Sequence, residues 1–267
     1  MERTPPIVTI TSDFGWRDYH LALIKGTILQ HTPNARIVDI SNAVANYNIV
    51  EGAFLFRHAW QAFPAGTIHL LSINDFDQPD RPFLVFSHQG HHFVGPDNGL
   101  FSLIFQEQPA SIFQLDTEDI SFSRFPLADI FGKAVGHLAQ DFPAGGMGSA
   151  VDQWLERITL QPVTGPNHIR GSVVYIDQFD NAILNIDRQL MENIGRDRSF
   201  ELYFKRHSPI TELSTSFHDV PVGEILCRFN SADLLEIAIN MDRGASLLGL
   251  KIEDTVQIDF SNGKKQT

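Results

Sequence analysis

One stretch decides the fold class: residues 7–40, IVTITSDFGWRDYHLALIKGTILQHTPNARIVDI. Residues 7–11 are apolar and β-branched, which is typical of a buried strand. Residues 18–31 are predicted to be helical because apolar side chains recur at helical spacing, at Leu21, Ile24, Ile28 and Leu29. Residues 36–40 form the next predicted strand. A strand, a helix and a second strand joined by short turns predict a parallel crossover unit.

The same alternation continues to residue 73. A second helix is predicted over residues 48–63 and a third strand over residues 67–73. A hairpin over residues 83–93 and a helix over residues 125–142 follow. We therefore predict an α/β domain with a largely parallel sheet covered by helices, and we expect its site beyond the carboxyl ends of the strands.

The second half of the chain has a different pattern. Glycine and proline are frequent from residue 143 to residue 167, which indicates a connection between domains. The chain then divides into 1–150 as an α/β domain, 151–167 as a linker and 168–267 as a smaller domain. Short apolar segments predict that this smaller domain is an antiparallel β-barrel or sandwich, with strands over 172–176, 200–204, 224–229, 234–239 and 256–260.

Composition excludes several classes of function. Lys and Arg number 20 against 32 Asp and Glu, so the net charge of −12 would repel a nucleic acid over most of the surface. The single cysteine, Cys227, can form no internal disulfide and no thiolate zinc cluster. With no signal-peptide pattern and no apolar run of about 20 residues, we expect a cytoplasmic protein that neither spans nor sits on a membrane.

Three segments contain residues that could carry chemistry. Asp13 follows the first strand, where it could bind the vicinal hydroxyls of a ribose or simply cap the next helix. The acidic loop over residues 74–81 could bind a cation or be a solvated turn. Residues 175–181 combine an acid, an aromatic ring and an amide suited to an ammonium group and a heterocycle, or form an ordinary Asx turn.

Other kinds of site find no support in the sequence. His88, His91 and His92 lie in or near the predicted hairpin turn, where neighbouring strand residues point to opposite faces, so we expect no metal site. Residues 95–99 lack the lysine and the spacing of a phosphate-binding loop, and no G-x-S-x-G motif occurs.

Taken in order, these segments resemble the S-adenosylmethionine hydroxide adenosyltransferases, which are relatives of the S-adenosylmethionine-dependent fluorinase and chlorinase. The resemblance covers nearly the whole chain. It rests on residues 10–15 (ITSDFG), 37–40 (IVDI), 50–54 (VEGAF), 94–99 (VGPDNG), 176–181 (IDQFDN), 230–231 (NS) and 235–238 (LEIA).

The resemblance implies an N-terminal α/β domain, a C-terminal β-barrel and a homotrimer whose ligand lies between the N domain of one subunit and the C domain of its neighbour. S-adenosylmethionine or adenosine is the implied ligand, with no cofactor beside it. The implied roles are ribose binding by Asp13, a pocket wall from Tyr47 and Phe217, ammonium binding by Asp177, adenine contacts from Phe179 and Asn181, and carboxylate binding by Ser231.

The implied reaction is attack of water on the ribose 5′ carbon, with methionine leaving. Family members orient and deprotonate that water with an Asp, an Arg and a His. This chain has Asn74 at the Asp position and Pro126 at the His position, and it keeps Arg81. An amide orients water but accepts no proton, and proline does neither. Asp75 or Asp77 could act as the base if the loop turns inward, so Arg81, Asn74 and Asp75 are the candidate catalytic residues.

Three functions remain open at this point. The first is slow hydrolysis of S-adenosylmethionine to adenosine and methionine through an altered site. The second is a non-catalytic protein that binds S-adenosylmethionine or adenosine, because the ligand-binding positions survive better than the catalytic ones. The third is a halide adenosyltransferase, because halogenating relatives also lack the Asp, Arg and His set. The retained Arg81 argues against this function. The carboxylates Asp75, Asp77 and Asp80 also argue against it, since carboxylates repel an incoming halide.

Overall fold

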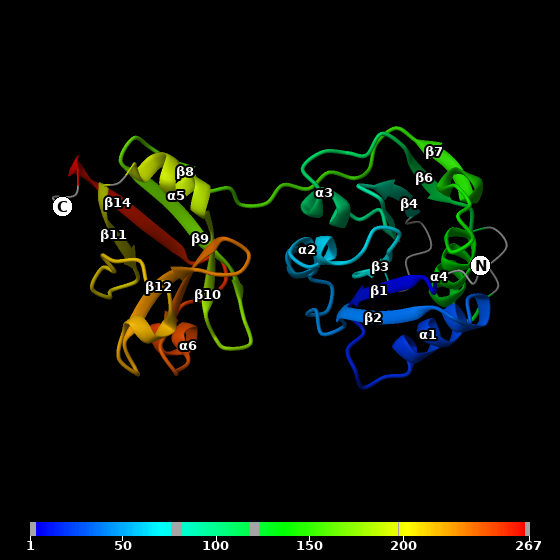
Figure 1. Cartoon of the computed structure of the whole chain (residues 1–267), viewed down its shortest axis with the longest axis horizontal. Coiled ribbons are helices and arrows are strands. Elements are labelled where there is room, and N and C mark those ends of the chain that lie inside the picture. Colours follow the sequence, from blue (N-terminus) through cyan, green and yellow to red (C-terminus); the bar gives the residue numbers. More distant parts are fainter. Residues whose placement is uncertain (1–3, 76–81, 118–122, 197, 265–267) are drawn as a thin grey trace. The chain divides into compact units, whose positions relative to one another are not determined.

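The computed structural model describes residues 4–75, 82–117, 123–196 and 198–264. The chain divides into two compact units, residues 1–159 and 160–267, and the division falls inside the predicted linker 151–167. Figure 1 shows the elements of each unit. Every helix within the described ranges is too short or too polar to traverse a lipid bilayer.

The first unit is built around one seven-stranded sheet in the order β2-β1-β3-β5-β4-β6-β7. Its strands are β1 (Ile7–Ser12), β2 (Arg36–Ser41), β3 (Ile68–Ser72), β4 (Phe83–His88), β5 (His91–Pro96), β6 (Ile112–Leu115) and β7 (Gly148–Val151). Its helices are α1 (His20–His31), α2 (Ile49–Arg57), η1 (Trp60–Ala62), α3 (Leu100–Ile104), α4 (Pro126–Leu138) and η3 (Ala144–Met147).

The sheet is mixed, which corrects the prediction of a largely parallel one. The strands β2, β1, β3 and β5 run parallel, whereas β4, β6 and β7 pair antiparallel with their neighbours. The reason is the hairpin of β4 and β5, whose two turn residues Gln89 and Gly90 both have positive φ. Such a tight turn forces antiparallel pairing, so the parallel part of the sheet ends there.

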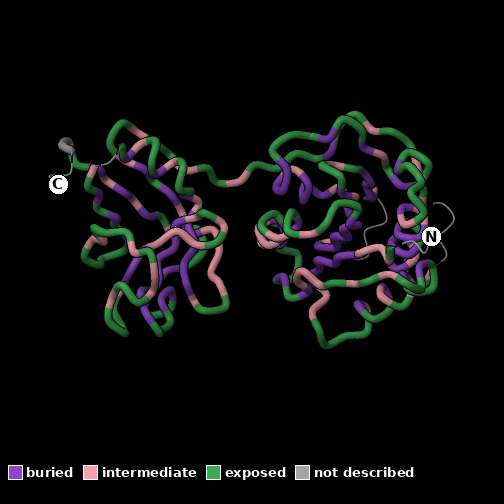
Figure 2. Tube along the Cα trace, viewed as in Figure 1, coloured by how far each residue is buried: buried purple, intermediate pink, exposed green. Residues whose placement is uncertain are grey.

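Two apolar layers cover the sheet, as the alternation of helix and strand predicts. On one face, Val8 and Ile10 of β1 pack in a core with α1 and α4, to which α1 contributes Leu21, Ile24 and Ile28. On the other face, α2, η1 and α3 form a second core with Leu71 and Phe93. In Figure 2 the buried residues of this unit lie along the strands and on the inner sides of the helices.

The second unit contains an antiparallel sheet in the order β11-β14-β9-β10-β13-β12, with β8 paired to β9. Its strands are β8 (Val163–Thr164), β9 (His168–Ile176), β10 (Ala182–Asp187), β11 (Arg198–Phe204), β12 (Ile225–Phe229), β13 (Leu234–Ile239) and β14 (Thr255–Lys264). Its helices are α5 (Arg188–Gly195), η4 (Phe217–Asp219) and α6 (Gly244–Leu248).

This unit is antiparallel, as predicted, but its sheet is a curled half-barrel and does not close into the predicted barrel. The long strand β9 pairs with β14 through its first half and with β10 through its second half, which curls the sheet. Among the described residues, the sheet order ends at β11 and β12. Single bridges at these two strands, Leu202 to Ile210 and Cys227 to Leu213, engage the irregular segment 205–216. This segment has no strand pattern of its own, so it adds no further strand to the sheet.

Candidate functional site

The first cluster of predicted site residues lies at the carboxyl ends of the parallel strands in the first unit. Asp13 directly follows β1 and is only 9% exposed. Its Oδ2 accepts hydrogen bonds from the backbone N–H groups of Tyr47, at 2.8 Å, and Asn74, at 3.2 Å. Asp13 thereby ties together the loops that follow β2 and β3. We call Asp13, Tyr47, Asn74 and Asp75 the ribose-side cluster, after the ligand group that the sequence predicts for Asp13.

The backbone at this cluster is held in an uncommon conformation. Tyr47 and Asn74 both have positive φ, 66° and 55°. A left-handed conformation is unfavourable for a residue with a side chain unless its surroundings fix it. Here the charged acceptor Asp13 supplies part of that constraint. The alternative role of Asp13 as a helix cap is wrong, because the N-cap of α1 is Tyr19 and has no side-chain cap bond.

Asp75 turns inward. It is 7% exposed, and the hydroxyl of Ser72 at the end of β3 donates to its Oδ1 over 3.1 Å. The beginning of the acidic loop is therefore not a solvated turn. Arg81, Asp77 and Asp80 lie outside the described residues. The side chain of Tyr47 is 69% exposed beside the buried carboxylates.

Two asparagines support the cluster and were missed in the sequence. The side-chain oxygen of Asn42 accepts a hydrogen bond from the hydroxyl of Ser12 at 2.6 Å, and its backbone carbonyl accepts one from the N–H of Gly15 at 2.7 Å. Asn46 donates from its side chain to the carbonyl of Asp13 at 3.2 Å. Both follow β2, so their position after a predicted parallel strand was the signal that could have identified them.

Pro126 is the first residue of α4, a position that suits proline because the N–H that proline lacks would have no partner within the helix there. The preceding ring, Phe125, packs against Phe14, with ring centroids 6.2 Å apart. An imidazole also lies here: the ring of His20 is 5.4 Å from Phe125 and 6.0 Å from Phe14. His20 was not singled out in the sequence, where it is one of 11 histidines.

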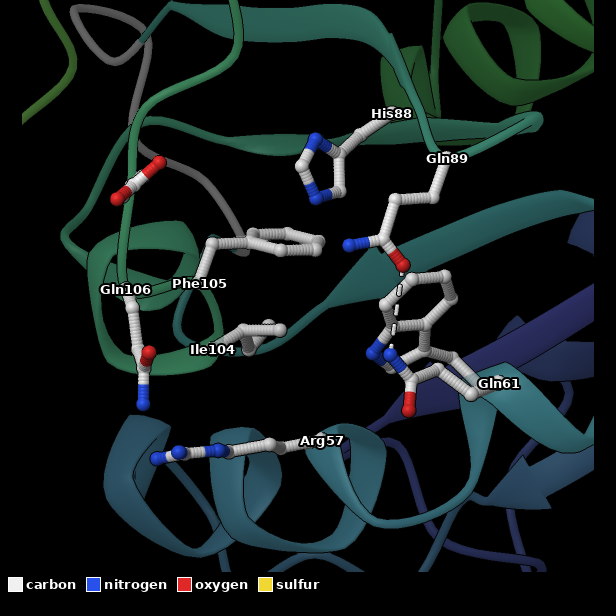
Figure 3. A pocket seen from close by; sticks show the side chains of 9 residues that line it. Arg57, Gln61, His88, Gln89, Ile104, Phe105 and Gln106 are labelled. Atoms are coloured by element: carbon white, nitrogen blue, oxygen red, sulfur yellow. Dashed lines mark hydrogen bonds between the residues drawn. The ribbon is translucent and has the colours of Figure 1, made fainter.

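A cavity of about 350 Å³ in the first unit is separate from this cluster (Figure 3). Arg57 of α2, the hairpin residue Gln89 and the rings of Trp60 and Phe105 line part of it, and none of the predicted site residues does. Gln89 lies next to the amino end of β5, whereas Asp13 lies at the carboxyl end of the parallel strand β1. The cavity therefore lies toward the amino ends of the parallel strands, opposite the carboxyl ends where the ribose-side cluster lies.

The second cluster is the turn between β9 and β10. Oδ1 of Asp177 accepts from the backbone N–H groups of Phe179, at 2.9 Å, and Asn181, at 2.8 Å. Its Oδ2 accepts from the side-chain amide of Asn181 at 3.0 Å. The segment is therefore an Asx-type turn, and since a carboxylate has about four acceptor positions, Asp177 keeps capacity for a ligand. Asn181 is buried, whereas Phe179 is 79% exposed.

Charged residues on β12 and β13 adjoin this turn. Arg228 and Glu236 are cross-strand partners, with Nε and Oε1 3.6 Å apart. Burial raises the pKa of Glu236, Arg228 opposes the shift, and the negative charge of Asp177 raises the pKa further. The guanidinium of Arg228 also lies over the ring of Phe217, 4.8 Å from its centroid.

Ser231 is exposed in the turn between β12 and β13. Thus Asp177, Phe179 and Asn181 lie in one turn, while Phe217 and Ser231 come from other loops of the same unit. Glu236 and Arg228 were not identified as site residues in the sequence. A carboxylate inside the apolar strand pattern 234–239 was the available signal.

These two clusters differ in what they could bind. The ribose-side cluster offers buried carboxylates suited to hydroxyl groups and water. The turn cluster offers the acceptor Asp177, the amide Asn181 and the exposed ring Phe179, which suit an ammonium group and a planar heterocycle. Among the described residues, no group of three His, Cys, Asp or Glu side chains is placed to hold a metal ion.

Curated relatives match this chain along nearly its full length. A protein named (R)-S-adenosyl-L-methionine hydrolase from Thermus thermophilus is 29% identical over 257 residues, which cover 91% of this chain and 96% of the relative. One of the same name from Methanocaldococcus jannaschii is 26% identical and covers 95% and 96%. A fluorinase from an Actinoplanes species is 24% identical and covers 95% and 97%.

Solved structures agree with these matches. An uncharacterized conserved protein from Thermotoga maritima superposes with a TM-score of 0.84 at 26% identity, covering 95% of this chain and 99% of that chain. A conserved hypothetical protein from Thermus thermophilus gives a TM-score of 0.74 at 26% identity, covering 97% and 100%.

Family models match both units of the chain. Residues 8–148 match the N-terminal domain of the SAM hydroxide adenosyltransferases, and residues 171–257 match their C-terminal domain. The predicted resemblance is confirmed: the chain belongs to the SAM hydroxide adenosyltransferase family.

Proposed function

We propose that this protein hydrolyses S-adenosylmethionine to adenosine and methionine. Water attacks the ribose 5′ carbon, a carbon–oxygen bond forms, and the carbon–sulfur bond breaks with its electron pair going to sulfur. Methionine leaves as a neutral thioether, and the water proton passes to a base. The observation that carries the proposal is the buried pair of carboxylates, Asp13 and Asp75, at the carboxyl ends of β1 and β3 in a member of this family.

Each carboxylate has a distinct role in the proposal. Asp13 binds the vicinal hydroxyls of the ribose; among the described residues, donors reach only its Oδ2. Asp75 orients the attacking water and accepts its proton, replacing the carboxylate that Asn74 lacks. Asn74 and Arg81 position the water and the ligand. Because sulfonium is a good leaving group, alignment of a partly desolvated water supplies much of the rate.

The turn cluster binds the rest of the molecule in this proposal. Asp177 accepts the methionine ammonium, Phe179 and Asn181 contact the adenine, Phe217 adds an apolar wall and Ser231 binds the methionine carboxylate. Arg228 pairs with the buried Glu236, so the carboxylate of Asp177 supplies the negative charge that favours a cationic group here. No cofactor takes part. We also propose a homotrimer in which the ribose-side cluster of one subunit and the turn cluster of its neighbour act on one ligand.

Hydrolysis in water labelled with heavy oxygen tests this function. The label should appear in the 5′ hydroxyl of adenosine, as read by mass spectrometry after chromatography, because the new bond forms at that carbon. The Asp75→Asn variant should lose about 10² to 10⁴-fold in rate, the usual contribution of a general base. The exposed loop variant Asp18→Asn is the matched control and should keep the wild-type rate. Adenosine without the heavy oxygen, or an unchanged hydrolysis rate in Asp75→Asn, would contradict the mechanism.

The second candidate is a binding protein without turnover. Asn74 and Pro126 favour it, because neither can accept a proton where family members have an Asp and a His. Binding of S-adenosylmethionine without release of adenosine would select this function. In that case the variant Asn74→Asp is expected to produce measurable adenosine release, because it restores an ionisable group at the position where family members have an Asp.

A further inference from the structure

We propose that Asp180 is a positioning residue that fixes the turn 177–181 in its ligand-binding form by capping α6; the inference rests on the proposed function of that turn. Asp180 has a φ of 68°, in the left-handed region that favours glycine. A residue with a side chain is unfavourable there unless other contacts hold it. Those contacts come from a helix that begins 64 residues later.

The contacts of Asp180 reach in two directions. Within the turn, its N–H donates to the carbonyl of Asp177 over 3.0 Å. Toward α6, its carbonyl accepts from the N–H of Ala245 at 2.6 Å, and its Oδ2 accepts from the N–H of Ser246 at 2.7 Å. Asp180 therefore links the turn to the first residues of α6 through both its backbone and its side chain.

Helix α6 lacks a cap of its own. Its N-cap residue, Arg243, makes no side-chain cap bond. The first N–H groups of a helix have no partner within the helix, and an anionic acceptor also interacts favourably with the positive end of the helix dipole. The carboxylate of Asp180 meets both requirements. Capping α6 in this way offsets the unfavourable φ of Asp180 and orders the turn.

The consequence concerns the residues on either side. Asp177 is bonded to the N–H groups of Phe179 and Asn181, the two neighbours of Asp180. If the tether to α6 is lost, these residues must be ordered when the ligand binds. In the proposed function, the turn holds parts of the ligand that are remote from the reacting carbon. The free energy needed to order the turn therefore weakens binding of the substrate and of the transition state equally. Loss of Asp180 should therefore raise KM and leave kcat unchanged.

Three substitutions separate the parts of this role. Asp180→Gly keeps the left-handed backbone and removes the carboxylate, so KM for S-adenosylmethionine should rise about tenfold with kcat within about twofold. Asp180→Asn keeps an oxygen acceptor and tolerates positive φ, so it should restore most of the wild-type KM. Asp180→Ala loses both features and should have the highest KM and the lowest melting temperature.

Asp254→Ala is the matched control. Asp254 makes a carboxylate bond of 2.6 Å to the N–H of Lys251, just beyond the other end of α6, and its described hydrogen bonds do not include residues 177–181. This variant should lose stability and keep the wild-type KM. If Asp180→Gly behaves in the same way, with a lower melting temperature and an unchanged KM, Asp180 is only structural and the inference is overturned.

Hydrogen exchange gives a readout that needs no turnover. In Asp180→Gly, the amides of Ser246 and of residues 177–181 should exchange faster than in the wild type, whereas Asp254→Ala should leave them unchanged. Unchanged exchange in Asp180→Gly would overturn the inference even if the protein proved inactive. A wild type that neither binds nor cleaves S-adenosylmethionine, with faster exchange in the variant, would instead count against the proposed function alone.

Discussion

At the residue scale, the two clusters use carboxylates in the same way. Asp13 and Asp177 each accept two backbone N–H groups from loop residues. Such bonds order the loop and leave the carboxylate with acceptor positions for a ligand. A substitution at these positions therefore risks changing both the backbone and the binding chemistry, so the test must separate them.

Asp13→Asn separates the two effects. The asparagine oxygen can still accept from Tyr47 and Asn74, so the melting temperature should change little. The negative charge is lost, so binding of adenosine should weaken by about 1.5 to 3 kcal/mol. Titration calorimetry measures the affinity. Asp18→Asn removes the same charge from an exposed position in the same loop and should bind as the wild type does. Equal affinities in both variants would show that Asp13 does not contact the ligand.

A buried histidine pair lies under α2 and η1 in the first unit. Nδ1 of His69 is 2.7 Å from the hydroxyl oxygen of Thr9, and its Nε2 is 3.1 Å from Nδ1 of His91. His69 is fully buried. Burial lowers the pKa of His69 from its ordinary value of 6.5 to about 3, with smaller contributions from His91 and His92. The imidazole of His69 is thus neutral in the folded protein at pH values where the same imidazole in the unfolded chain begins to bind a proton.

This shift predicts how stability depends on pH. The folded pKa lies below the unfolded one, so the contribution of His69 is complete above pH 6.5 and is lost as the pH falls toward about 3. The loss amounts to at most about 1.4 kcal/mol per pH unit. Urea unfolding of the wild type and His69→Gln should therefore show a stability difference that narrows between pH 7 and pH 5. A constant difference would mean that folding does not lower the pKa of His69.

At the element scale, helix α2 runs from the ribose-side cluster to the cavity at the amino ends of the parallel strands. Its N-terminal end follows Tyr47, and its last residue, Arg57, lines the cavity of Figure 3. In its interior, Gly52 lies directly on Ile73, the residue before Asn74. A Cβ at position 52 would stand 2.0 Å from Cδ1 and 3.3 Å from Cγ1 of Ile73. The close approach of α2 to the sheet therefore requires glycine here.

Gly52→Ala is expected to destabilise the protein by about 1 to 3 kcal/mol, because Ile73 is fully buried and has to shift. Gly26→Ala is the matched control in the interior of α1, where a Cβ would meet nothing within 4 Å. That variant should be more stable than the wild type by about 0.5 to 1 kcal/mol, the helix propensity difference. Denaturant unfolding measures both, and a stabilised Gly52→Ala would show that α2 has room to move.

At the scale of the whole molecule, the two clusters lie on separate units of the chain. If a complete site needs a neighbouring subunit, assembly and binding must be linked. We expect light scattering at micromolar concentration to give the mass of three 30.0 kDa chains. Dilution that dissociates the oligomer should abolish ligand binding in parallel. A monomer that still binds adenosine or S-adenosylmethionine would contradict the trimeric site.

Much of the fold could be predicted from local pattern. The strands at residues 7–11 and 234–239, the first helix and the hairpin near Gln89 are visible as apolar periodicity and turn residues, because these features depend on neighbours along the chain. The strand β10 was missed, as were α5 and α6. The apolar part of β10 is short, and α6 has only five residues, so neither leaves a pattern that stands out.

The sequence by itself determined the family and the candidate residues Asp13, Asn74, Asp75 and Asp177. Only the tertiary structure decided what Asp13 contacts, that Asp75 turns inward, that the second sheet stays open and that Asp180 caps α6. The bonds of Asp13 to Tyr47 and Asn74 span 34 and 61 residues, and the bond of Asp180 to Ser246 spans 66. Contacts over such separations depend on strand order and sheet curvature, which no local pattern encodes.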